Sequence, residues 1–202
     1  MEKYVNNYAK LYKNALVNNK FSDIDKKLNS YKNRLRKMYL SENFEKHNVY
    51  PTMNVTKIYA IIAMCLELKK EKLSDKEIID IINGGFEKLR GIVKIIAKVI
   101  NLLPNTYQIA KKWNINDHNN RIKDGSITYD YFEASDEKVE YRISKCMYIE
   151  MFEYYGIRSL CKIFCLTDES AYANILKYVK FIRHSDLSTG ECCHDEVINK
   201  KK

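Results

Sequence analysis

The chain has 202 residues, 46% of them hydrophobic, and a formal net charge of +9. That much apolar surface can build a sizeable core and excludes a chain that is disordered along its whole length. The positive charge would suit nucleic acid. The lysines are mixed with acidic residues, however, as in Lys69-Lys70-Glu71-Lys72, and we expect no nucleic-acid partner.

The cysteines and the apolar segments indicate a reducing compartment. Six cysteines in 202 residues are too few for a disulfide scaffold. Residues 1–4 lack the apolar segment of a signal peptide. The most apolar stretch, 91–103, is interrupted by Lys94 and Lys98 and is too short to span a bilayer. We therefore expect a cytoplasmic protein with reduced thiols and no membrane partner.

The first part of the sequence predicts helices. Apolar residues at helical spacing indicate a helix over 2–18, and Ser22 with Asp25 can cap a second helix that completes a hairpin. Residues 55–68 are apolar nearly all round, which is typical of a buried central helix.

Two more helices are expected before the character of the sequence changes. Ser74 and Glu77 have the spacing of a capping box at the start of one helix. Pro104 ends an amphipathic helix that follows it. Asn, Asp and His then crowd positions 114–120, which predicts a loop.

The remaining sequence predicts a small sheet with helices. β-Branched and aromatic residues indicate strands over 126–134 and 139–143, and two more strands are expected within 179–198. Between them a helix over 144–155 should end at Gly156. The predicted fold class is α+β: a helical N-terminal half followed by a small antiparallel sheet with packed helices.

No Gly/Ser-rich or Pro-rich linker divides the chain, so we expect a single domain. Its parts are a helical hairpin, a helical core and an α+β part that carries the site, over 1–50, 51–110 and 111–202. The tyrosine-rich N-terminal helices could also pack on a second copy of the chain, which would make a homodimer.

Chemistry-bearing residues gather in the C-terminal third. Cys192, Cys193, His194 and Asp195 could supply a nucleophile, a general base and an orienting group. On a strand, Cys193 and Asp195 share one face and His194 points to the other, so a triad would need a bulge or a partner from elsewhere. Cys146 opens a predicted helix, a position that lowers the pKa of a thiol.

Three further candidates each have a structural explanation as well. Cys165 is also typical of a core residue, Asp168 of a helix cap and Arg183 of a surface ion pair. The spacing of cysteine and histidine matches no common metal motif, and the sequence predicts no metal and no cofactor.

An ordered set of residues runs through the last third of the chain: Arg142, Cys146, Glu150, Gly156, Cys165, Asp168, Arg183, Leu187, Gly190 and Cys193. This order resembles the L-2-amino-thiazoline-4-carboxylic acid hydrolase family, most clearly over 140–198. The resemblance departs from the family pattern directly after the last cysteine, at His194, and after the arginine, at His184.

The resemblance implies a hydrolase that opens a cyclic, non-peptide C–N bond of a small carboxylate substrate such as 2-amino-thiazoline-4-carboxylate. The expected roles are catalytic for Cys193, His194 and Asp195, and substrate-binding for Arg183, Cys146, Cys165 and Asp168. Arg183 would pair with the carboxylate of the substrate.

Other functions stay open at this point. Cys146, Cys165, Cys193 and His194 could converge on a metal or an iron–sulfur centre in a metal- or redox-binding protein. A basic, helical protein that binds nucleic acid or another protein is a further class. A member of the same family could also serve a different small-molecule pathway.

Overall fold

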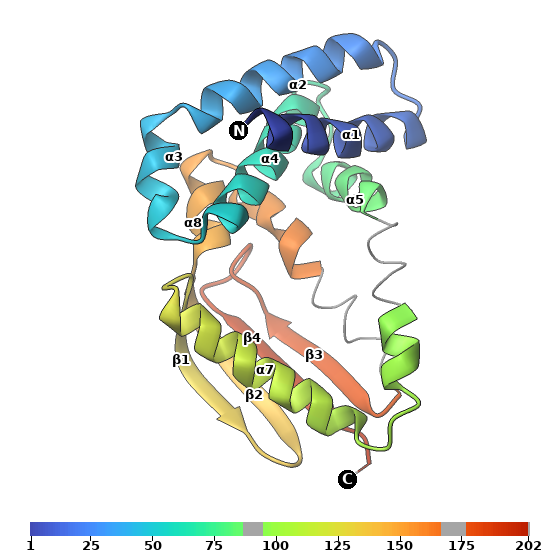
Figure 1. The fold of residues 1–202 in the computed structure, drawn as a ribbon, viewed down its shortest axis with the longest axis vertical. Helices are drawn as coiled ribbons and strands as arrows, with labels where there is room; N and C mark the ends of the chain where they lie inside the picture. The colour runs from blue at the N-terminus through green and yellow to red at the C-terminus, as the bar shows by residue number, and fades with distance from the viewer. Residues whose placement is uncertain (87–94, 167–176, 202) are drawn as a thin grey trace. The chain divides into compact units, whose positions relative to one another are not determined.

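The computed structural model describes residues 1–86, 95–166 and 177–201 (Figure 1). The chain forms two compact units, one made of Met1–Lys88 with Met151–Ile163 and the other of Leu89–Glu150 with Phe164–Lys202. Helices precede a four-stranded antiparallel sheet along the chain, so the predicted α+β fold class is confirmed. The single domain over 1–202 stays a prediction.

The first unit is helical throughout its described residues. Its elements are α1 (Glu2–Asn18), α2 (Ile24–Tyr39), α3 (Glu42–Lys46), η1 (His47–Val49), α4 (Thr52–Lys69), α5 (Asp75–Gly85) and η2 (Arg158–Cys161). The predicted helix over 2–18 is confirmed. The predicted capping box is also confirmed, since Ser74 Oγ accepts from the Glu77 N–H while the Glu77 carboxylate accepts from the Ser74 N–H.

The start of α2 differs from the prediction. Its N-cap is Asp23, with a left-handed backbone at φ 51° and no side-chain hydrogen bond to the helix, so the predicted cap by Ser22 and Asp25 is wrong. The turn after α1 explains the difference. Lys20 and Asp23 both have positive φ there, and this tight path sets the helix start by chain geometry.

α4 is the centre of the first unit. Ile58, Tyr59 and Ile61 are fully buried, as predicted for a helix that is apolar on all sides. Glu67, near its C-terminal end, is buried as well. Its carboxylate pairs with Arg34 of α2 at 2.5 Å and with Lys70 at 2.8 Å, which satisfies the one charge that this helix buries in the described structure.

The second unit contains the sheet, in the order β1-β2-β4-β3. Its elements are α7 (Thr106–Lys123), β1 (Ile127–Ala134), β2 (Lys138–Cys146), the start of α8 (Met147–Tyr154), β3 (Val179–Ser185) and β4 (Cys193–Asn199). Helix α7 lies across one face of the sheet (Figure 1). Tyr107 and Ala110 of α7 are buried there against Val139, Val179 and Val197.

Two predictions for this unit are wrong: the loop over 114–120 and the start of the next helix at residue 144. Residues 114–120 belong to α7, because a helix anchored by Tyr107 and Ala110 and free of Gly and Pro outweighs the weak loop preference of Asn and Asp. Residues 144–146 are strand, because β1 pairs with β2 as far as Ile127 opposite Cys146. Gly156 does end α8 at φ 68°, as predicted.

None of the helices within the described residues is long and apolar enough to cross a membrane. Asp168 and the helix that it was expected to cap lie outside the described residues.

Candidate active site

The two faces of the sheet separate the residues of the Cys192–Asp195 string. Cys193 and Asp195 are buried on the face that α7 covers. His194 lies on the opposite face, where its Nε2 is 2.8 Å from Glu140 Oε1. The predicted alternation is confirmed, and the string alone forms no catalytic triad.

Arg183 and Asp195 form a buried pair across β3 and β4. The Arg183 Nε and Nη2 donate to the two carboxylate oxygens of Asp195 at 2.8 and 2.9 Å, and Nη1 donates to the Cys165 carbonyl at 2.8 Å. Such a bidentate pair fixes both partners in one geometry. Arg183 therefore connects the segment of Cys165 to β4, and its guanidinium already has a carboxylate partner within the chain.

Three thiols lie on the helix-covered side of the sheet close enough to interact electrostatically: Cys146 at the end of β2, Cys165, and Cys193 at the start of β4. Burial raises the pKa of Cys193 to about 12, and Cys165, Asp195 and Cys146 add to the rise. The Leu187 N–H, 3.3 Å from the Cys193 sulfur, opposes it. Cysteines 146, 165 and 193 are thus near enough for their charges to affect one another. A thiol that is to act as a nucleophile here must first lose a proton.

Cys146 has the more favourable surroundings for a thiolate. Burial raises its pKa to about 11. The backbone N–H groups of Tyr148 and Ile149, at the start of α8, donate to its sulfur, and the charge of Arg121 also lowers its pKa. These are the donors and the cation that favour the ionised form of a cysteine.

The second half of α7 presents polar groups to the sheet. Asn114, Asp117, His118 and Arg121 follow one another at helical spacing and are buried or partly buried. The His118 ring stacks on Phe132 of β1, with ring centroids 3.8 Å apart. The inner face of α7 therefore changes from apolar to polar along its length.

Sequence reasoning missed these residues because 114–120 was predicted to be a loop. A signal was available. The segment 105–124 contains neither Gly nor Pro, and Asn114, His118 and Arg121 recur at intervals of four and three residues. Such spacing places side chains on one face of a helix.

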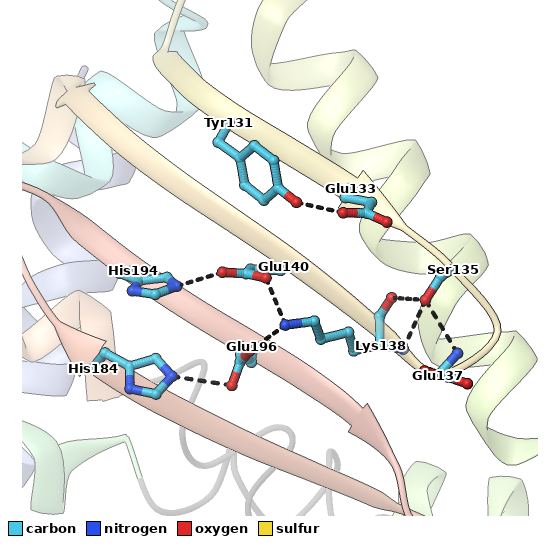
Figure 2. A network of polar contacts seen from close by, with 9 residues as sticks. All are labelled: Tyr131, Glu133, Ser135, Glu137, Lys138, Glu140, His184, His194 and Glu196. Atoms are coloured by element: carbon cyan, nitrogen blue, oxygen red, sulfur yellow. Dashed lines mark hydrogen bonds and ion pairs between the residues drawn. The ribbon is translucent and has the colours of Figure 1, made fainter. Parts of the chain in front are cut away.

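The opposite face of the sheet carries a network of charged groups (Figure 2). Lys138 Nζ lies 2.7 Å from both Glu140 Oε2 and Glu196 Oε1. Each glutamate also contacts a histidine, His194 at 2.8 Å and His184 at 3.0 Å. The histidines that depart from the family pattern thus belong to this network, and His194 is directed away from the thiols.

Metal binding was the alternative raised by the cysteines and His194. Among residues 1–86, 95–166 and 177–201, no three His, Cys, Asp or Glu side chains are arranged to hold a metal ion. Asp168, a predicted substrate-binding residue, is outside these ranges.

These features define an α+β protein with interacting thiols and a buried Arg–Asp pair between a helix and an antiparallel sheet. The family model of L-2-amino-thiazoline-4-carboxylic acid hydrolase matches residues 53–195. The chain belongs to this hydrolase family, and the resemblance noted in the sequence is confirmed. The matched segment contains α4 except for Thr52, all of α7 and all three interacting cysteines. No curated protein and no solved structure matches the chain.

Proposed function

We propose that this protein opens the ring of a small cyclic amidine that carries a carboxylate, with 2-amino-thiazoline-4-carboxylate as the model substrate. The observation that carries the proposal is the electrostatic interaction among three neighbouring thiols, those of Cys146, Cys165 and Cys193. All three lie within the segment matched by the hydrolase family. A thiolate is a strong nucleophile for such an electron-poor carbon.

The reaction proceeds in two stages. A cysteine sulfur attacks the amidine carbon, the C=N electron pair moves to nitrogen, and one ring bond of that carbon breaks as the leaving atom takes a proton. Water then attacks the same carbon and expels the cysteine. The oxygen of water becomes a carbonyl, and the net reaction is the addition of one water to the substrate.

Cys193 was expected to be either the nucleophile or a thiol that lines the site, and Cys146 is a second candidate nucleophile. Its two N–H donors and the nearby charge of Arg121 support Cys146. Cys193 has one N–H donor and the anionic Asp195 beside it. We therefore assign the attack to Cys146 and a lining role to Cys193.

Proton transfer to the leaving atom requires a group on the helix-covered side of the sheet. His118 of α7 is on that side, stacked on Phe132 and 4.5 Å from the Tyr129 ring centroid. His194, the base expected from sequence, contacts Glu140 on the other face. We therefore propose His118 as the general acid.

The test is turnover of 2-amino-thiazoline-4-carboxylate by the purified protein, with identification of the product. Cleavage of the C–N bond predicted from sequence releases an amine, whereas cleavage of the ring C–S bond releases a thiol. Either product supports ring opening, and its identity shows which ring bond is cleaved. Absence of turnover with this substrate and with related cyclic amidines would contradict the proposed function.

Replacement of the cysteines one at a time assigns the nucleophile. Cys146→Ala should abolish turnover, Cys193→Ala should reduce it, and Cys192→Ala is the matched control, since Cys192 precedes β4 and its carbonyl is held by Ser185. Abolished turnover in Cys193→Ala with turnover retained in Cys146→Ala would reverse the assignment.

A further inference from the structure

The carboxylate of the proposed substrate requires a cation on the thiol side of the sheet. Arg183 was expected to supply it, but both oxygens of Asp195 occupy Arg183 Nε and Nη2. Arg142 pairs with His194 in the sheet register, which places it on the opposite face. Neither of these strand arginines therefore offers its charge to a carboxylate on the thiol side, whereas α7 carries a further arginine, Arg121.

Arg121 lies in the last turn of α7, beside Cys146. Its charge acts on the Cys146 thiol, and its guanidinium donates to the Tyr148 hydroxyl. Its side chain is 23% exposed, and the contact between Nε and Asp117 Oδ1 is long, at 3.3 Å. This arginine is less tightly held than Arg183, whose ion-pair distance is 2.8 Å at 10% exposure.

Ser126 adds an independent observation next to Arg121. Its N–H donates to the Arg121 carbonyl at 3.1 Å, and its carbonyl accepts from the Met147 N–H at 2.9 Å, so it lies between the end of α7 and the residue after Cys146. Ser126 is 2% exposed, and its Oγ has no hydrogen-bond partner in the described structure. A buried hydroxyl without a partner costs on the order of 1–3 kcal/mol, which indicates a group that a bound ligand completes.

We propose that Arg121 and Ser126 Oγ bind the carboxylate of the substrate and so place its ring beside Cys146. This inference rests on the proposed function and names the substrate-recognition residues of that site. The guanidinium supplies charge and paired N–H donors, and the serine hydroxyl supplies one further donor to a carboxylate oxygen.

The acidic neighbours of Arg121 set the range of ligands. Asp117 and Asp124 both interact with its charge. Asp124 already accepts from the Ser126 N–H at 3.0 Å, and Asp117 is 49% exposed. One monovalent carboxylate can therefore displace the long Asp117 contact, whereas a more highly charged ligand such as a phosphate monoester would meet two anions.

The experiment compares two substrates that differ only in the carboxylate, 2-amino-thiazoline-4-carboxylate and 2-amino-thiazoline. Wild-type protein should prefer the carboxylate in kcat/KM. Arg121→Gln should remove that preference by raising KM for the carboxylate on the order of 100-fold, with little change for 2-amino-thiazoline. Arg121→Lys should restore part of it. Arg142→Gln, which removes one positive charge from the other face, is the matched control and should behave as wild type.

Ser126→Ala separates ligand binding from folding. Removal of a buried hydroxyl that has no partner should leave the thermal unfolding midpoint unchanged or higher, while KM for the carboxylate rises about 5-fold. A hydroxyl with a purely structural role would leave KM unchanged, and that result would overturn the assignment of Ser126.

The outcomes distinguish this inference from the proposed function. If Arg121→Gln turns over both substrates with the same kcat/KM values as wild type, the carboxylate site is overturned. The hydrolase proposal stays intact in that case. If wild-type protein neither turns over nor binds either compound in calorimetry, the hydrolase proposal fails and the carboxylate site fails with it.

Discussion

Two helices of equal length, α4 and α7, differ in the side chains that they bury. Each has eighteen residues. α4 is apolar on nearly every side and buries its residues in the core of the first unit. α7 buries Tyr107 and Ala110 in its first half and then turns Asn114, His118 and Arg121 toward the sheet.

This difference explains why α4 could be predicted from the sequence, whereas the second half of α7 could not. A repeating pattern of apolar residues indicates which positions of a helix are buried, and most positions of α4 are apolar and buried. In α7 the groups that face inward over its second half are those of the proposed site, and two of them, Asn114 and His118, have weak helix preferences. Secondary-structure prediction from local sequence patterns is expected to fail most often at positions that belong to a functional site instead of the core.

The largest expected effect concerns the charged pair on the face that α7 covers. Asp195→Ala should lower the free energy of unfolding by about 4 kcal/mol, because it leaves the Arg183 guanidinium buried without its carboxylate. Urea denaturation measures the loss. The double variant Arg183→Met/Asp195→Leu should recover most of it, and a double variant as unstable as Asp195→Ala would show that the pair is not the cause.

In α4 the corresponding change is apolar. Ile61→Ala should cost about 3 kcal/mol by leaving a cavity in the core. The kcat/KM of the folded fraction should stay at the wild-type value, because no group of the proposed site is altered. A loss of turnover without a loss of stability would break the contrast between the two helices.

His118 tests the polar half of α7. His118→Phe keeps a ring against Phe132 and should change stability by less than about 1 kcal/mol, while turnover falls on the order of 100-fold through loss of the proton donor. His194→Phe is the matched control on the opposite face and should lose far less. An equal loss in both variants would contradict the assignment of His118.

The smallest expected effect is a difference in the rate at which two thiols are alkylated, that of Cys65 in α4 and that of Cys146. Burial raises the pKa of both thiols, that of Cys146 to about 11 and that of Cys65 higher still. Below a raised pKa a thiol stays protonated, so alkylation of Cys146 by iodoacetamide should increase up to about pH 11, while Cys65 stays unmodified in the folded protein. Mass spectrometry after timed alkylation reads each site. A plateau for Cys146 near pH 8.5, the ordinary thiol value, would show that its surroundings do not disfavour the thiolate.

Much of the fold could be predicted from sequence because packing dominates it. The helix over 2–18, the buried helix over 55–68 and the capping box at Ser74 each follow from a local pattern, and the strand alternation that separates Cys193 from His194 follows from strand geometry.

The site could be predicted only in part. Family resemblance singled out Cys146, Cys165 and Cys193, whose charges do interact. The pairing of Arg183 with Asp195 depends on the register of β3 and β4, which a single sequence does not determine. His118 and Arg121 were missed because their positions depend on the packing of α7 on the sheet, a tertiary effect that overrides local preference.

The most direct test of the account is the hydrolysis of 2-amino-thiazoline-4-carboxylate by wild-type protein, Cys146→Ser and Cys192→Ser at one pH. The account predicts ring opening by wild type and by Cys192→Ser, and its loss in a Cys146→Ser protein that unfolds at the wild-type temperature. Ring opening that persists in folded Cys146→Ser would contradict the central claim that Cys146 is the nucleophile of this site.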